Sequence, residues 1–240
     1  MNTPDPNVGN LRAPRWLTPF GLFALLFFIG AQLTAFFISP PERDMGNLQK
    51  IIYVHLPGAW LMGVAYLVVM VASIGYLWKR RERQDLVAAS AAEVGLVLNG
   101  LTLALGSLWA RPTWGVWWTW DPRLTTTAIL FVIFAGYFAL RSFVDDDDRR
   151  ARWSAVVGIL GFINFIIVYM SVRWWRTLHQ VQSSPETLDS PYVLGVRLNA
   201  IAFLFLMIFF IAYRYHIARI ERATQSLEEE RALTGGAVHV

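Results

Sequence analysis

Six long apolar segments constrain this chain more than any other feature of its sequence. Each one approaches or exceeds the roughly 20 residues that an α-helix needs to cross the ~30 Å hydrocarbon core of a bilayer. The predicted spans cover residues 17–38, 59–78, 87–109, 124–143, 153–172 and 198–215. We expect Pro57 in the first turn of the second helix, where proline is well tolerated. The sequence therefore predicts an all-α polytopic membrane protein with six transmembrane helices, in which residues 1–240 form a single integral membrane domain.

The composition supports this class and excludes several others. Hydrophobic residues make up 55% of the chain, and its mean hydropathy is +0.42. The pI of 9.6 and the net charge of +4 are better explained by basic cytoplasmic loops than by a nucleic-acid partner. The absence of cysteine excludes disulfides, thiolate metal sites and cofactor attachment through the chain's own thiols. The sequence contains neither a phosphate-binding glycine loop nor a His-Glu-x-x-His motif, and we expect no enzymatic activity.

The distribution of basic residues predicts the orientation of the chain. Six spans place both termini on one side of the membrane, and 14 of the 21 lysine and arginine residues lie on that side. Because basic residues are enriched in cytoplasmic segments, both termini are predicted to be cytoplasmic. We expect a cytoplasmic tail at residues 216–240, helical through about Arg231, and a solvated acidic loop at Asp145–Asp148. The first apolar run is longer than the 7–15 residues of a signal-peptide core, so we expect no cleavable signal peptide.

A tryptophan-rich loop is predicted between the third and fourth spans, at about residues 110–125. Four of the chain's 11 tryptophans fall within residues 114–120, directly before an Asp-Pro-Arg turn. Tryptophans at span ends commonly form the aromatic belt of a membrane interface. Four indoles beside an acid and an arginine instead indicate a platform for a flat, amphipathic ligand. The acid can orient a tryptophan N–H, hold the arginine or cap the fourth helix. The candidate binding residues are Arg111, Trp114, Gly115, Trp117, Trp118, Trp120, Asp121 and Arg123.

Two histidines are predicted on the same face of the membrane as this loop. The first, third and fifth loops share one side, which groups His55 and His179 with the tryptophans and leaves His216 and His239 on the other side. Two neutral imidazoles can take both axial positions of a haem iron. Indole faces can pack on a porphyrin, and arginine can bind haem propionates in a bidentate way. His55 and His179 are therefore candidate ligands of a haem iron.

The tryptophan-rich loop closely resembles the signature of the WWD-domain family of haem-handling membrane proteins. That signature reads Trp-Gly-x-x-Trp-x-Trp-Asp-x-Arg-Leu-Thr, and here it is filled by Trp114, Gly115, Trp118, Trp120, Asp121, Arg123, Leu124 and Thr125. Residues 54–57 and 174–180 also match the short members of the family that serve cytochrome c maturation in Gram-negative bacteria. Six spans and a length of 240 residues fit those short members across nearly the whole chain.

The resemblance implies a non-enzymatic haem-transfer protein of the bacterial inner membrane. It implies that haem b is held at the periplasmic face of the loop, with His55 and His179 as the axial ligands of its iron. The implied partners are a periplasmic, membrane-anchored haem chaperone that receives the haem, an ABC-type ATPase with its membrane subunit, and a small single-span subunit. Arg173 and Arg176 add positive charge on this face, where they can contact either the propionates or the chaperone.

Two other functions stay open at this point. A b-type membrane electron carrier also binds haem through two histidines, but on facing helices within the spans rather than in loops. A small-solute transporter needs polar residues or broken helices near the middle of the membrane, and here only Gln32, Asn99, Asn164 and Glu93 are available.

An acid inside a membrane is a functional candidate by default. Glu93 nevertheless lies close enough to the cytoplasmic edge to contact a partner or a headgroup.

Overall fold

The computed structural model describes residues 11–179 and 190–235, and this part of the chain is almost entirely helical. A π-helical turn, η1 (Thr34–Ile38), extends the first helix, and a short 3₁₀ helix, η2 (Asn47–Ile51), leads into the second. Among the described residues, six helical segments are long and apolar enough to cross a membrane, which confirms the predicted polytopic fold. The six long helices are α1 (Leu17–Leu33), α2 (Ile52–Lys79), α3 (Glu82–Trp114), α4 (Pro122–Phe143), α5 (Asp147–Trp174) and α6 (Ser190–Gly235).

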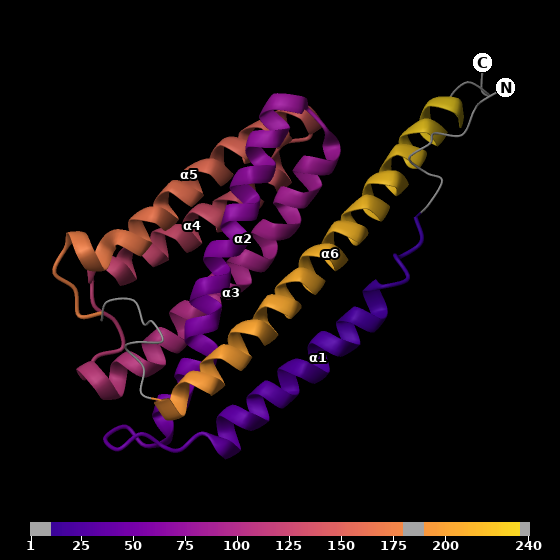
Figure 1. Cartoon of the computed structure of the whole chain (residues 1–240). Helices are drawn as coiled ribbons and strands as arrows, with labels where there is room; N and C mark the ends of the chain where they lie inside the picture. Colours follow the sequence, from indigo (N-terminus) through magenta and orange to yellow (C-terminus); the bar gives the residue numbers. More distant parts are fainter. Residues whose placement is uncertain (1–10, 180–189, 236–240) are drawn as a thin grey trace.

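The helices form two groups in space (Figure 1). Helices α2, α3, α4 and α5 form a bundle, and α1 and α6 run side by side along it. α6 joins the groups, because Phe203 and Met207 of α6 belong to the main buried cluster of the bundle. On the other side of α6, Asn199 accepts a hydrogen bond from the Gln32 amide of α1 (2.6 Å) and donates to the Ala31 carbonyl (3.3 Å). Such buried polar contacts hold helices together where lipid tails provide no hydrophobic driving force.

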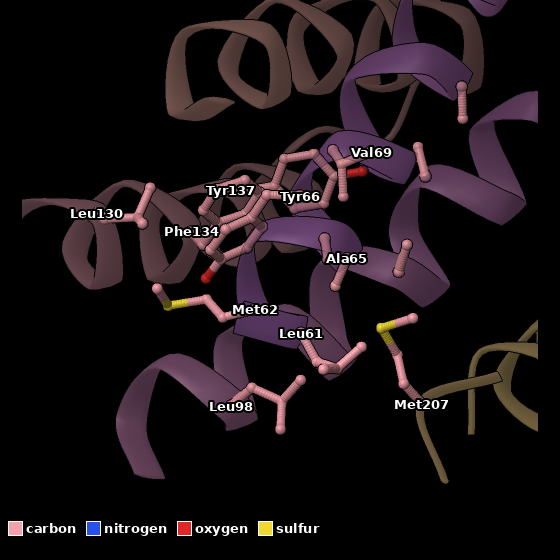
Figure 2. Close-up of a cluster of buried hydrophobic side chains, with 14 of the residues drawn as sticks. Leu61, Met62, Ala65, Tyr66, Val69, Leu98, Leu130, Phe134, Tyr137 and Met207 are labelled. Atoms are coloured by element: carbon pink, nitrogen blue, oxygen red, sulfur yellow. The ribbon is translucent and has the colours of Figure 1, made fainter. Parts of the chain in front are cut away.

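A stack of two aromatic rings lies at the centre of the bundle (Figure 2). Tyr66 of α2 and Phe134 of α4 are fully buried, with ring centroids 3.8 Å apart and planes inclined by 12°. Gly95 of α3 leaves room for the tyrosine, since a Cβ at this position would lie 2.6 Å from the ring. Gly161 of α5 does the same for Phe134, again at 2.6 Å. Two glycines and two rings thus bring four helices into close contact.

This arrangement predicts that Gly161→Ala destabilises the fold. The added methyl group would overlap the buried ring of Phe134, and overpacking of this kind typically costs roughly 1–3 kcal/mol. Gly136→Ala is the matched control, because a Cβ at Gly136 meets nothing within 4 Å. The control is expected to gain about 0.5–1 kcal/mol from helix propensity. Thermal unfolding of both variants in detergent measures the difference. Equal Tm values for the two would show that the Phe134 ring can shift to accommodate the added methyl group.

Packing moves the start of α2 away from its predicted position. The helix begins at Ile52 rather than near Pro57, so His55 lies in its first turn and not in a loop. Ile52 and Tyr53 are buried against residues of η1 and α6 in a second apolar cluster. This packing outweighs the loss of the one backbone hydrogen bond that a proline inside a helix removes.

The predicted tryptophan-rich loop is also shorter than expected. α3 continues through Trp114 and α4 begins at Pro122, so the connection covers residues 115–121 instead of about 110–125. Proline at the first helical position favours an early start of α4. α6 begins at Ser190, before the predicted span, and continues to Gly235, which confirms the expected helical tail through Arg231.

Ion pairs join the helices at the end of the bundle away from this connection. Arg141 of α4 binds Asp85 of α3 through two hydrogen bonds of 2.6 and 2.8 Å, and both side chains are at most 15% exposed. Arg222 of α6 pairs with Glu82 of α3 (2.8 Å) and with Asp147 of α5. The prediction of a solvated acidic loop at residues 145–148 is therefore wrong in part. Asp147 and Asp148 lie in the first turn of α5, and each forms an ion pair with an arginine outside α5.

The other polar residues inside the spans also link helices. Glu93 of α3 pairs with Arg214 of α6 at 2.7 Å, so its carboxylate binds a residue of this chain. Asn99 donates to the Tyr66 hydroxyl (3.4 Å), and Asn164 donates to a backbone carbonyl of α4 (3.0 Å). These side chains hold the bundle together, which accounts for them without a solute pathway.

Candidate functional site

The connection between α3 and α4 is held in shape by its two ends. Gly115 ends α3 with a left-handed backbone (φ 78°), and its N–H donates to the Arg111 carbonyl at 3.0 Å. The Arg111 guanidinium in turn bonds to the Gly115 carbonyl. At the other end, the Asp121 carboxylate caps α4 by accepting a hydrogen bond from the Arg123 N–H (2.9 Å). Capping satisfies an amide that a helix start otherwise leaves without a partner.

Two of the four tryptophans in residues 114–120 are largely exposed. Trp117 is 56% exposed and Trp120 is 81% exposed, whereas Trp114 and Trp118 are half-buried. The rings of Trp118 and Trp120 lie edge to face, with centroids 5.9 Å apart. Large indoles left open in this way are available to a ligand, to lipid headgroups or to a partner protein.

The Asp121 carboxylate joins this connection to the segment that follows α5. Asp121 is only 7% exposed. Beyond the cap, its carboxylate accepts hydrogen bonds from the Thr177 hydroxyl and from the Leu178 N–H, both at 2.7 Å. The Thr177 hydroxyl also accepts a hydrogen bond from the backbone N–H of His179 (3.0 Å). Two loops that are more than fifty residues apart in sequence are thereby tied together beside His179.

His55 and Arg123 each carry one buried nitrogen atom without a hydrogen-bond partner. His55 lies against α3 at Gly106, where a Cβ would come within 3.3 Å of the imidazole Cε1. Its Nδ1 is buried without a hydrogen bond, and so is Nη1 of Arg123. The imidazole of His55 lies within electrostatic reach of both His179 and Arg123. Most buried polar groups find a partner, so two orphaned nitrogens in one place call for a ligand or water.

Comparison with known proteins assigns the family. A family model described as "CcmC: Heme exporter protein C" matches residues 4–230 of the chain. The chain belongs to the heme exporter protein C family.

Three similar relatives carry that name. The relative from Bradyrhizobium diazoefficiens is 39% identical over 214 residues (87% of this chain, 80% of the relative). The Escherichia coli K12 relative is 34% identical over 167 residues (69% and 68%), and the Haemophilus influenzae relative is 31% identical over 207 residues (84% and 84%).

Membership of the heme exporter protein C family confirms the resemblance that the tryptophan signature indicated. Together with the six apolar helices, it identifies the chain as a multi-pass protein of the bacterial inner membrane. The structure places His55, Asp121, Arg123 and His179 at one end of the bundle. His216 lies in α6 near the opposite end, and His239 lies outside the described residues.

Two features of this end of the bundle were not foreseen from the sequence. Arg111 was a candidate binding residue, and in the structure its guanidinium also bonds to the Gly115 carbonyl at the end of its own helix. Thr177 was not singled out, although its hydroxyl makes one of the two hydrogen bonds that join the loops and also accepts from the backbone N–H of His179. A threonine two residues before the amide that it binds is a recognised local turn pattern, and this pattern was the available signal.

A cavity of about 470 Å³ lies elsewhere in the protein, between η1 and η2. It is lined by Gln32, Leu33, Phe36, Phe37, Asn47 and Lys50, none of which is a predicted site residue. The predicted residues lie around the connection between α3 and α4, where the exposed Trp117 and Trp120 adjoin the buried Asp121.

Proposed function

We propose that the protein holds haem b at the end of the bundle that carries the tryptophans, on the periplasmic face, and delivers it to a periplasmic, membrane-anchored haem chaperone for the maturation of c-type cytochromes. Membership of the heme exporter protein C family supports a haem-handling role within an exporter complex. The observation that carries the finer proposal is the convergence of His55, Arg123 and His179, with orphaned nitrogens on the first two.

The residues at this end fit a haem cargo. His55 and His179 would serve as axial ligands of the iron, since imidazole suits iron and two imidazoles complete its coordination. The buried guanidinium of Arg123 would hold a propionate through a charge-assisted hydrogen bond, for which Nη1 is available. Trp118 and Trp120 would cover the porphyrin with their rings. Haem is the substrate of this transfer, and the chain's task is to bind it, orient it and release it.

The exposure of the tryptophans favours transfer over electron carriage. An electron carrier gains from enclosing its haem between helices on both sides, and His55 does lie in a helix. His179, however, follows the end of α5 in an irregular segment, and Trp117 and Trp120 are open to the outside. A chaperone approaching from the periplasm would reach a haem at this surface without rearranging the bundle.

We further propose that an ABC-type ATPase, its membrane subunit and a small single-span subunit work with this chain. The sequence carries no phosphate-binding glycine loop, so any ATP-driven step would fall to a partner. Membership of the heme exporter protein C family supports assembly into an exporter complex.

Transfer of haem to the chaperone tests the proposed function. Trp118→Ala/Trp120→Ala is expected to lower chaperone loading roughly tenfold, because two aromatic contacts with the porphyrin are lost. Membrane insertion should be unchanged. Trp78→Ala is the matched control, since Trp78 is 83% exposed at the far end of α2. The measurement is the amount of covalently loaded chaperone per cell, relative to membrane-inserted protein. Normal loading by the double variant would mean that these indoles form only an interfacial belt.

A further inference from the structure

We propose that Thr177 and Asp121 are positioning residues that hold His179 in place as an iron ligand, and that Asp121 does not contact the haem itself. The proposal rests on the proposed function, because it concerns how one of the two axial ligands is held. Four hydrogen bonds carry it: Asp121 accepts from Arg123 N–H, Thr177 hydroxyl and Leu178 N–H, and Thr177 accepts from His179 N–H. We call these four hydrogen bonds the clasp.

Both oxygens of the Asp121 carboxylate accept hydrogen bonds within the clasp. One oxygen accepts from the Arg123 N–H and the Thr177 hydroxyl, and the other accepts from the Leu178 N–H. The residue is almost completely buried, so little of it remains accessible to a ligand. Hydrogen bonds to an ionised acceptor are roughly twice as strong as neutral ones. The carboxylate, at the cap of α4, therefore holds the segment that follows α5.

The Thr177 hydroxyl connects the Asp121 carboxylate to His179. An ionised carboxylate can only accept, so the hydroxyl proton points to Asp121 and its lone pairs remain free for the His179 N–H. A side chain in this position must donate and accept at once. Serine and threonine meet this need, whereas valine has the same shape as threonine and does neither.

The two proposed iron ligands differ in how much they need such support. His55 is held by α2 and by close contact with Gly106 of α3. His179 lies beyond the end of α5 at Trp174, and the described residues 175–179 are irregular. An imidazole on an irregular segment coordinates well only when that segment is ordered, and the ordering must come from contacts such as the clasp.

The clasp predicts a selective defect when the Thr177 hydroxyl is removed. Thr177→Val should weaken ligation by His179 about tenfold, the lower range for loss of an outer-shell partner at a metal site. Ligation by His55 should persist. The purified variant is then expected to keep most of its haem while its absorption spectrum changes from six-coordinate low-spin towards five-coordinate high-spin. Added imidazole should restore the low-spin spectrum, because it occupies the position that His179 leaves.

Control variants separate this role from general damage. Thr177→Ser keeps the hydroxyl and should resemble the wild type. Thr113→Val removes a hydroxyl at the end of α3 that donates to the Trp109 carbonyl of its own helix, and it should also resemble the wild type. The Thr177→Val spectrum should match that of His179→Gly, with the same response to imidazole, and not that of His55→Gly. Damage to the fold would instead affect both ligands and would not respond to imidazole.

The outcomes distinguish the clasp from the proposed function. If the wild type shows low-spin haem that depends on both histidines, but Thr177→Val matches the wild type, then the clasp is wrong and the haem site stands. If Thr177→Ser fails in the same way as Thr177→Val, the hydroxyl is not the operative group and the clasp is again wrong. If wild-type haem binding does not depend on His179, the proposed axial ligation fails, and the clasp fails with it.

Discussion

His55→Ala/His179→Ala is expected to abolish six-coordinate low-spin haem binding by the purified protein. Removal of an axial ligand should exceed the roughly 10–100-fold loss of affinity that follows loss of an outer-shell partner at a metal site. Each single variant should retain one axial ligand and give a five-coordinate, high-spin spectrum with reduced haem content. Haem per protein and spin state, both measured by absorption spectroscopy, test the expectation.

The structure supplies a matched control for the histidine variants. His216→Ala removes a half-buried imidazole in α6, near the other end of the bundle, and should leave the spectrum unchanged. His55→Ala, His179→Ala and His216→Ala each remove one imidazole, so a general loss of packing would affect all three single variants. If the double variant kept the haem content and spectrum of the wild type, neither histidine would be a ligand of the iron.

Asp85→Asn is expected to give the largest loss of stability among the substitutions considered. It leaves the Arg141 guanidinium without its bidentate partner at a site where both side chains are largely buried. Breaking one partner of a buried ion pair typically costs about 3–5 kcal/mol. For a chain of this size, that cost corresponds to a Tm lower by about 10 °C. Thermal unfolding in detergent, followed by loss of the monodisperse protein peak, provides the measurement.

Two further variants isolate the effect of the unpaired charge. Asp85→Asn/Arg141→Gln removes both charges and should recover part of the lost Tm, because no buried cation is left unpaired. Arg152→Gln breaks an exposed pair with Asp148 and should change Tm very little, as exposed pairs contribute about 0–1 kcal/mol. A double variant that is less stable than Asp85→Asn would point to packing by Arg141, which lies over the Tyr137 ring, as the dominant contribution.

The sequence predicted the number of spans and their class because the bilayer imposes a length and a polarity that are visible residue by residue. Helix limits depend on contacts between distant segments, and these are not visible in the same way. Pro57 was expected near the start of a helix, yet burial of Ile52 and Tyr53 against η1 and α6 extends α2 before it. Asp147 was expected in a solvated loop, but Arg222, distant in sequence, pairs with it.

The candidate site was predictable for a similar reason. An even or odd number of crossings decides which loops share a face, so the sequence alone groups His55 and His179 with the tryptophans. The partner of each side chain could not be predicted. Arg111 bonds within its own helix end, and Asp121 binds Thr177 across two loops whose approach depends on how α4 and α5 pack. The family signature identified the candidate residues, and the structure added their hydrogen-bond partners, such as Thr177 for Asp121.

The length of α6 has a mechanical consequence. At ~1.5 Å per residue, its 46 residues form a rod of about 69 Å, more than twice the ~30 Å hydrocarbon core. Ion pairs of Arg222 with Glu82 and Asp147 hold its far portion against α3 and α5, and its first residue, Ser190, lies about 48 Å along the helix from Arg222. Between these two points, Asn199 bonds to α1, and Phe203 and Met207 pack in the core of the bundle. One continuous helix, held along its length, therefore connects the ion-paired end of the bundle to the end where Val196 packs with Tyr53 and Trp109.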